Sequence, residues 1–401
     1  MFLGQVLSAD GSCQNAVNEA MVNQLLRGME PGSAKTGSYS DARKRLPREL
    51  ARELARSIAT LMGTRTRARW TWRGWHIKLL DGTTILMPDI PGNRELYLQH
   101  GSQKAAAGFP IARLVEVISL AHGALLDVAM GPYKGKGTGE HALFRELLKC
   151  FVKGDIMLTD SYYASDFLIA ALMGMGVDFI SEQHGARQTD FRTGEKLGRC
   201  DHLAQWAWPA RPQWMSPEEY YSFPAELTVG ETKVGKKVLV TSFLDPRKVR
   251  KREAGSLFVQ RWSAKLDLRN GKDTLGMAAL SCKTPGMREK EIWVYMLAYN
   301  LGQLLMAQAA VRAAVLARQL SFKHAVRVWL TWSHKQFVSD VAEDLPALFR
   351  LISYVRVGRR PGRIEPRAVK QRPKPFARLQ TARRKARRNI TLYGHPRKPA
   401  S

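Results

Sequence analysis

Two aspartates stand where the chain is predicted to leave a buried strand, and their carboxylates are the groups best suited to chemistry. Asp81 follows an alternating run that contains Ile77 and Leu79, and Asp160 follows the apolar run 155–159. Carboxylate oxygens hold magnesium, and two such ions can activate water on one side of a phosphorus atom and stabilise the leaving oxygen on the other. The pair therefore indicates phosphodiester hydrolysis or transfer. Aspartate is also common in turns and helix caps, so either residue alone is weak evidence.

The surrounding pattern predicts the strands that would bring the two carboxylates together. Apolar and polar residues alternate from Trp75 to Asp81, Gly82 is expected to make a turn, and 84–87 is expected to return as the second strand of a hairpin. The run 155–159 is typical of a strand buried on both faces. If the strands that carry the two aspartates pair side by side, both carboxylates lie at one edge of the sheet.

The elements that follow predict a mixed α/β domain. The run 111–130 turns at His122 and Gly123, which indicates an antiparallel meander. Helices are expected over 140–152 and 164–175, and the first of these would cover the sheet. Another strand is expected at 177–181. Strands and helices therefore alternate through this part of the chain.

Two other regions differ in character from this domain. Before residue 65 the pattern is helical: one helix is expected over 16–26, and Leu50, Leu54, Ile58 and Leu61 recur at the spacing of a second. From 183 to about 250 the composition shifts to Gly, Arg, Trp and Pro, with a strand-like run at 239–243, which predicts an inserted β-rich segment.

The charge of the chain favours a polyanionic partner. The formal net charge is +28, and the segment 351–401 carries 16 basic residues and one acid, Glu365. Nucleic acid is the first explanation of such an excess, and an arginine-rich tail suits phosphate because the guanidinium forms a planar fork. A solubilising tail or a ribosomal-type arm is the alternative.

Other classes of protein are disfavoured. The longest apolar stretch, 167–180, is too short to span a bilayer, and Met1 opens without a basic leader, so a cytoplasmic protein is expected. The four cysteines lack the paired spacing of zinc sites or disulfide frameworks, and Cys200 with His202 has no second pair nearby.

Several stretches in one order resemble the DDE transposases of bacterial insertion sequences, group four. The resemblance covers most of the chain, and the order of the matches makes it specific although each match alone is weak. The matching stretches are Leu80-Asp81-Gly82-Thr83-Thr84, Phe109-Pro110-Ile111-Ala112-Arg113, 131–140, Thr159-Asp160-Ser161-Tyr162-Tyr163, Gln183-His184, Lys283-Thr284-Pro285, Glu291-Ile292-Trp293, Ala298-Tyr299-Asn300-Leu301 and 357–363.

The resemblance implies catalytic and metal-binding roles for Asp81 and Asp160, but it fails at the third acid. The family's third signature is a helix bearing Tyr, Arg, Glu and Lys, and the matching residues are Phe258, Arg261, Lys265 and Lys272. Lys265 stands where a catalytic glutamate is expected. An ammonium group cannot ligate magnesium and would repel it. Three nearby acids are expected to be poor substitutes: Asp267, which points roughly 200° around the helix from Lys265, and the more distant Glu289 and Glu291.

The same resemblance implies the fold, the cofactor and the partners. We expect an RNase H-like mixed sheet with flanking helices, a β-rich insertion and a helical N-terminal region, with Mg²⁺ or Mn²⁺ as the cofactor. Double-stranded DNA, both element ends and target, is the expected partner, with Arg261, Arg269 and Lys272 as DNA-binding residues and a homodimer in the DNA complex. The alternative is a catalytically impaired protein that binds DNA and inhibits or assists an active transposase.

Five segments are predicted from these patterns. They are a helical region at 1–68 that binds DNA, a first part of the RNase H-like core at 69–182, a β-rich insertion at 183–252, a second part of the core with the third signature at 253–345, and a basic C-terminal tail at 346–401.

Overall fold

The computed structural model describes residues 1–8, 10–99, 108–135, 137–278, 280–335, 341–357 and 381–394. Most of the predicted basic tail, including the Gly358 to Arg363 part of the resemblance, lies outside these ranges. Within them, no helix combines the length and the apolar character needed to cross a membrane.

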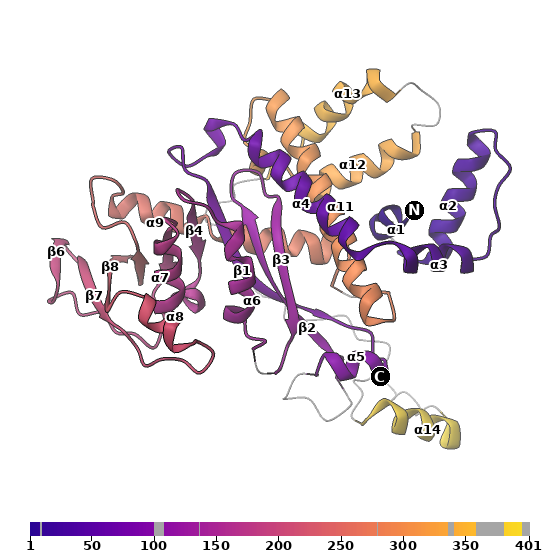
Figure 1. Ribbon diagram of the computed structural model, residues 1–401. Coiled ribbons are helices and arrows are strands. Elements are labelled where there is room, and N and C mark those ends of the chain that lie inside the picture. Colours follow the sequence, from indigo (N-terminus) through magenta and orange to yellow (C-terminus); the bar gives the residue numbers. More distant parts are fainter. Residues whose placement is uncertain are drawn as a thin grey trace, which may run out of the picture.

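One mixed sheet of nine strands organises the described part of the chain (Figure 1). The strand order is β3-β2-β1-β4-β5-β9-β8-β7-β6. The strands are β1 (Ile77–Leu86), β2 (Ile111–Ser119), β3 (Leu125–Pro132), β4 (Ile156–Thr159), β5 (Asp178–Glu182), β6 (Glu195–Gly198), β7 (Asp201–Ala207), β8 (Glu226–Val234) and β9 (Lys237–Thr241). In the first five, β1, β2 and β3 are antiparallel neighbours, whereas β1, β4 and β5 run parallel. This order and these directions confirm the expected RNase H-like mixed sheet.

The predicted hairpin at Gly82 is wrong, because β1 runs without a break from Ile77 to Leu86. It pairs with β2 along its whole length, from Lys78 opposite Ser119 to Leu86 opposite Ile111. Gly82 is not among the glycines with positive φ, so it continues the strand instead of turning it. Asp81 therefore lies in the middle of a central strand and not at its end.

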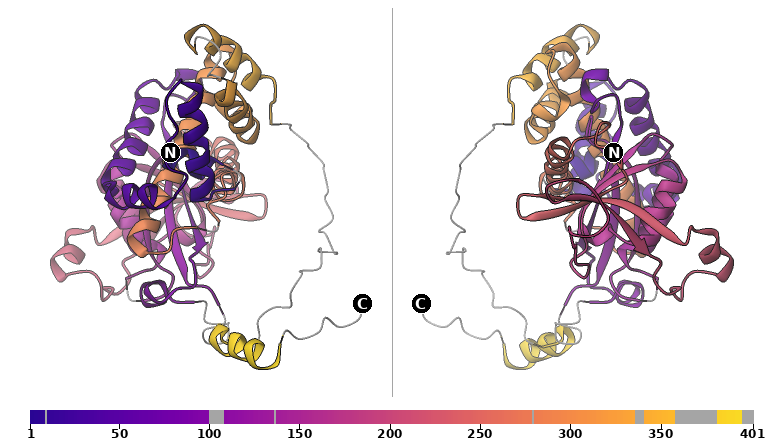
Figure 2. Two further views of the ribbon diagram at one scale, coloured as in Figure 1. Left: turned by 90° about the vertical axis from the view of Figure 1, so that its right-hand side faces the viewer. Right: turned by 90° about the vertical axis from the view of Figure 1, so that its left-hand side faces the viewer.

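Helices cover both faces of the sheet (Figures 1 and 2). On one face Ile77 and Leu79 pack in a core shared with α4 and α11; on the other, Leu80 packs with residues of α6 and α7. The helices are α1 (Phe2–Leu7), α2 (Cys13–Leu26), α3 (Gly37–Arg45), α4 (Arg48–Thr64), α5 (Pro91–Leu96), α6 (Glu140–Leu147), α7 (Asp166–Gly174), α8 (Pro217–Ser222), α9 (Lys251–Val259), α10 (Trp262–Arg269), α11 (Pro285–Arg312), α12 (Phe322–Lys335), α13 (Val341–Ser353) and α14 (Arg383–Tyr393).

The helix α4 has the predicted period but presents a different face to the core. Its buried residues are Ala51, Ala55, Ala59 and Met62, whereas Leu50, Leu54 and Leu61 of the predicted apolar stripe are exposed. The small alanines let α4 pack closely against α11, to which it is also tied by a buried asparagine: Asn300 donates from Nδ2 to the carbonyl oxygen of Ala55 at 2.8 Å.

The β-rich segment is a continuation of the same sheet. β9 pairs antiparallel with β5, so the strands β6 to β9 extend the sheet beyond its first five strands. In Figure 1 they form the arm at the left. Sequence patterns predicted strands here but did not indicate that they would join the core sheet.

Candidate active site

Asp81 is held on the α10 side of β1 in a nearly buried position. Its side chain belongs to the same face as Ile77 and Leu79, and the residue is 8% exposed. The backbone N–H of Gly82 donates to its Oδ1 at 3.0 Å. Burial raises the pKa of Asp81 to about 6, Lys265 acts against this rise, and the neighbouring Asp160 adds to it. The carboxylate thus sits in a site that favours a compensating cation.

Asp160 is brought beside Asp81 by the parallel pairing of β4 and β1. Leu158 pairs with Leu79, so each aspartate lies two residues further along its own chain and on the same face of the sheet. Thr159 fixes this register, because its Oγ1 donates to the carbonyl oxygen of Leu80 at 3.1 Å. The Oδ1 of Asp160 accepts from the N–H of Tyr162 at 3.0 Å, which caps the short turn that follows. The sequence prediction that the two strands lie side by side is correct.

The third signature was expected on one helix, but its residues are divided between α9, α10 and the turn that follows α10. α9 ends at Val259 and α10 begins at Trp262, so Arg261 stands at the junction. Its guanidinium is buried, lies 5.3 Å from the centre of the Phe258 ring, and approaches Asp160 with Nη1 at 3.8 Å from Oδ2. The break between the helices turns Arg261 toward the second aspartate.

Lys272 and Arg269 occupy different environments. Lys272 lies in the π-helical turn Asn270–Thr274, and its ammonium donates to Thr83 Oγ1 at 3.1 Å and to the carbonyl oxygen of Thr84 at 2.8 Å. It therefore ties the end of α10 to β1 directly after Asp81. Arg269 is exposed on α10.

Lys265 projects from α10 into the same region and is exposed to solvent. Its ammonium lies 5.2 Å from the centre of the Trp262 ring and is close enough to Asp81 to lower the pKa of that carboxyl. The position matched to the third acid therefore carries a positive charge within electrostatic reach of the first aspartate.

The three nearby acids considered as substitutes are engaged elsewhere. Asp267 is buried and pairs with Arg318 at 2.6 Å, and Glu289 pairs with Arg48 at 3.0 Å. Glu291 accepts hydrogen bonds from the backbone N–H groups of Ser281 and Cys282 at 2.9 and 2.8 Å. Their contacts support the expectation that none of them replaces the missing glutamate.

One acidic neighbour was missed by sequence reasoning. Glu116 on β2 is the direct cross-strand partner of Asp81 and is buried. Its Oε1 has no hydrogen-bond partner among the described residues. Burial, together with Asp81 and Asp267, raises the pKa of Glu116 to about 8, so the group is largely protonated at neutral pH. No local signal in the sequence identifies it, because cross-strand register depends on the assembled sheet.

The carboxylates of Asp81 and Asp160 are the kind of donor that a hard divalent cation takes. Asp81 and Asp160 supply the carboxylates, and magnesium commonly completes its shell with water. Among the described residues, no group of three or more His, Cys, Asp or Glu side chains is arranged to hold a metal ion. Lys265 carries an ammonium group, so it adds no ligand for a second ion.

A groove includes Tyr162, which lies in the turn that follows Asp160. Its lining includes His141, Tyr162, His184 and Arg187. The Nε2 of His141 contacts the carbonyl oxygen of Tyr162 at 2.7 Å, and Arg187 pairs with Asp166 at 2.8 Å. Tyr162 thus brings an aromatic ring, and the ion pair of Arg187 with Asp166 a pair of charges, to the wall of this groove.

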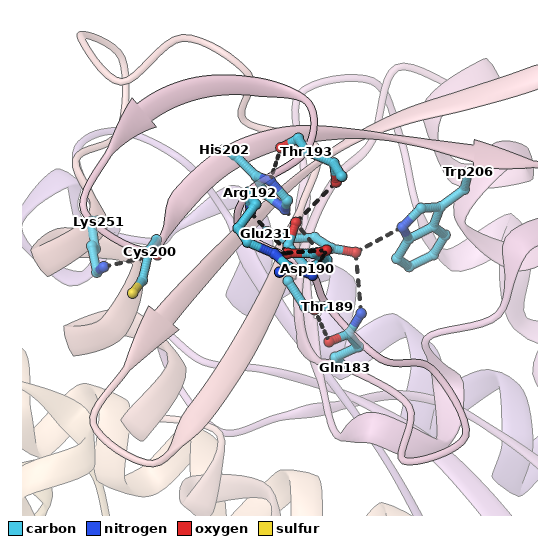
Figure 3. A network of polar contacts seen from close by, with 10 residues as sticks. All are labelled: Gln183, Thr189, Asp190, Arg192, Thr193, Cys200, His202, Trp206, Glu231 and Lys251. Carbon is cyan, nitrogen blue, oxygen red and sulfur yellow. Dashed lines mark hydrogen bonds and ion pairs between the residues drawn. The ribbon is translucent and has the colours of Figure 1, made fainter.

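A buried polar network supports the loop that forms one wall of this groove (Figure 3). Glu231 on β8 is at its centre and receives hydrogen bonds from Trp206 at 2.8 Å and Gln183 at 3.1 Å. His202 Nε2 also contacts Glu231, at 3.1 Å, while His202 Nδ1 contacts the carbonyl oxygen of Thr193 at 2.6 Å. A carbonyl oxygen can only accept, so Nδ1 of His202 donates in the contact with Thr193. Arg187 stacks on Trp206, 3.7 Å from its ring centre, which links the network to the groove.

Comparison with known proteins identifies relatives of the chain. Residues 76–301, which are 226 of the 401 residues, match the family described as the transposase DDE domain. The chain is 28% identical to the transposase InsG for insertion sequence element IS4 from Escherichia coli over 317 residues, covering 75% of this chain and 69% of InsG. It is 29% identical to the putative transposase InsZ of the same organism over 106 residues, covering 26% of this chain and 34% of InsZ.

A solved structure is also similar. The piggyBac transposase, in a synaptic complex with hairpin DNA, aligns with 71% of this chain and 58% of its own at a TM-score of 0.40 and 11% identity.

Proposed function

Because the chain belongs to the DDE transposase family, we propose that it is the transposase of an insertion sequence, which binds the element's terminal inverted repeats and cuts and joins DNA strands there. The observation that carries this proposal is the placement of Asp81 and Asp160 at matching positions of two parallel neighbouring strands. The family uses a divalent metal ion, and Asp81 and Asp160 are the residues that would hold it. The bound ion supplies the charge that polarises a phosphoryl oxygen and activates water.

The surrounding residues have distinct tasks in this proposal. Arg261 lies against Asp160 and faces the position of the scissile phosphate, where its planar fork suits phosphate oxygens. Lys272 holds the segment after Asp81 in place through Thr83 and Thr84. Arg269 on the exposed side of α10 contacts the DNA backbone. In the DNA complex the protein acts as a homodimer, with element ends and target DNA as its partners.

The charge at Lys265 favours a second candidate function, in which this chain binds the element ends without cutting them. Such a protein would occupy the ends and inhibit or assist an active transposase. The ammonium group lies near Asp81, so it competes with a cation there and supplies no ligand. Cleavage should therefore be weak or absent, whereas binding through the basic residues should persist.

Cleavage of a labelled duplex that carries the element's ends, with Mg²⁺ or Mn²⁺, tests both candidates. The proteins compared are the unmodified chain, Lys265→Glu, Asp81→Ala and the double variant. Cutting by the unmodified chain that depends on Asp81 supports the transposase. Cutting by Lys265→Glu alone, abolished by Asp81→Ala in the double variant, supports the binding-only protein. If no variant cuts and none binds the ends, both candidates fail.

A further inference from the structure

A guanidinium group without a partner is buried at the start of the longest helix. Arg288 lies near the N-terminal end of α11 and is 1% exposed. Its Nε, Nη1 and Nη2 atoms have no hydrogen-bond partner among the residues that the structure describes. The centre of the Tyr97 ring lies 5.6 Å away, which offers only a weak cation–π contact. The side chain is therefore a buried cation with five N–H donors to satisfy.

The acid Glu291 acts on this cation but makes no hydrogen bond to it. Glu291 stands one turn further along α11 and acts on Arg288 electrostatically. Its two carboxylate oxygens, however, accept the N–H groups of Ser281 and Cys282. Arginine is not deprotonated in proteins, and a buried charge without a hydrogen-bonded partner is destabilising. An anionic ligand at this point would remove that destabilisation.

The first turn of α11 offers further donors beside Arg288. Thr284 makes no side-chain cap, and the N–H groups of Gly286 and Met287 have no acceptor among the described residues. A long helix concentrates positive partial charge at this end. Gly286 is exposed, so the backbone of this turn is open to solvent. Free N–H groups, a helix N-terminus and an arginine fork are the elements of an oxyanion site.

The neighbourhood of the helix end is basic. Gly92 of α5 lies against Pro285, because a Cβ there would be 3.8 Å from the proline ring. Just before α5, Asp89 pairs with Arg383 at 2.9 Å, and Arg383 opens the helix α14, which contains further arginines. α5 thus lies between the N-terminus of α11 and a basic helix, which Figure 1 shows beside it.

We propose that Arg288 and the first turn of α11 bind a phosphate group of the DNA backbone. The assignment of this phosphate to DNA rests on the proposed function, because a transposase binds DNA. The oxyanion chemistry itself does not, because the same site would accept inorganic phosphate. A tetrahedral oxyanion suits the site since it can accept from the helix N–H groups and the guanidinium at once.

Thermal unfolding with inorganic phosphate tests the oxyanion site without DNA. We compare the unmodified chain with Arg288→Met and with Lys283→Met, which removes an exposed charge from the same helix end. Without phosphate, Arg288→Met should unfold at a higher temperature than the unmodified chain, because it no longer buries an unpaired charge. Phosphate should raise the Tm of the unmodified chain and of Lys283→Met by about 2–4 °C relative to chloride at equal ionic strength. That rise should be absent in Arg288→Met.

An equal phosphate effect in all three proteins would overturn the site. If Arg288→Met does not fold, Arg288→Lys provides the second comparison, since it keeps the charge but loses the fork and should show a smaller phosphate effect than Lys283→Met.

Duplex binding identifies the source of the phosphate. The dependence of affinity on salt should weaken by about one phosphate contact in Arg288→Met. If the phosphate effect depends on Arg288 but the salt dependence of duplex binding does not change, the site binds free phosphate and the DNA assignment is wrong. If duplex binding fails for every protein while the phosphate effect remains, the proposed function fails and the oxyanion site stands.

Discussion

Glu140 places its carboxylate directly over the α-carbon of Gly82: a Cβ built on Gly82 would lie 2.5 Å from Oε2 of Glu140. The carboxylate has little freedom to move away, because Tyr163 donates to the same oxygen at 2.8 Å. Gly82 is thus required where the strand that carries Asp81 passes under α6. Its neighbour in sequence is one of the two candidate metal ligands, so any shift of the strand at Gly82 also moves that ligand.

Gly82→Ala should therefore lower the free energy of unfolding by about 1–3 kcal/mol, the usual cost of overpacking. Adding Glu140→Ala should restore part of the loss, since it removes the clashing oxygen. Gly63→Ala is the control, because that helical glycine meets nothing within 4 Å and alanine should be neutral or stabilising there. Urea denaturation of these three variants and of the unmodified chain measures the effect, and equal stability of Gly82→Ala and the unmodified chain would contradict it.

Lys265→Glu should create a protein whose thermal stability rises with Mg²⁺ or Mn²⁺. The substitution replaces an ammonium near Asp81 with a carboxylate, so metal-free protein gains repulsion among acids and the bound ion relieves it. Lys265→Gln should respond less, because it removes the repelling charge without adding a ligand. The metal response of Lys265→Glu should be lost when Asp81→Asn is added. A metal response that survives that addition would show that the ion binds elsewhere.

His122 should make the protein less stable in mild acid. Burial, followed by the charge of Arg318, lowers the pKa of His122 to about 3 in the folded protein, while an unfolded chain protonates histidine near 6.5. The unfolded state therefore binds the proton first, and the stability that is present above pH 6.5 is lost as the pH falls toward 3. The loss from this residue between pH 7 and pH 5 is roughly 2 kcal/mol.

His122→Asn removes the titrating ring but keeps an acceptor for the N–H of Ala124, which His122 Nδ1 accepts at 3.2 Å. Chemical denaturation at pH 5 and pH 7 should show a smaller loss for this variant. The same slope in both proteins would rule out His122 as the cause.

Glu231→Ala should be strongly destabilising, by about 3–5 kcal/mol, because it leaves the donors of His202, Trp206 and Gln183 without their shared acceptor. Glu226→Ala removes an exposed acid from the same strand and should change stability by less than about 0.5 kcal/mol. Guanidinium denaturation followed by tryptophan fluorescence compares them. Similar midpoints for the two variants would show that the network of Figure 3 contributes little to stability.

The sequence allowed prediction of the mixed sheet, because alternating and fully apolar runs are local patterns. It did not allow prediction of Glu116, which becomes a neighbour of Asp81 only through the register of β1 and β2. The hairpin expected at Gly82 was wrong for a related reason. Glycine is typical of turns, yet here it provides space for Glu140, a residue on another element.

The sequence showed where the third signature lies but not that its helix is broken. The family resemblance matched Arg261, Lys265 and Lys272 to this signature, whereas the break between α9 and α10 depends on how both helices pack against the sheet. The sequence also did not predict which face of α4 is buried, since its alanines and not its leucines pack against α11. The division of the chain into five segments, and the metal-binding and DNA-binding roles of the named residues, stay predictions.

Joining β9 to β5 also determines what happens if the segment 183–252 is removed. β5 would then become an exposed sheet edge, with the backbone groups that now pair Ile180 with Thr241 left open to other chains. Uncovered edges of this kind recruit strands from neighbouring molecules. A chain without this segment would thus be prone to aggregate. By pairing with β5, the segment keeps the edge of that strand from pairing with other molecules.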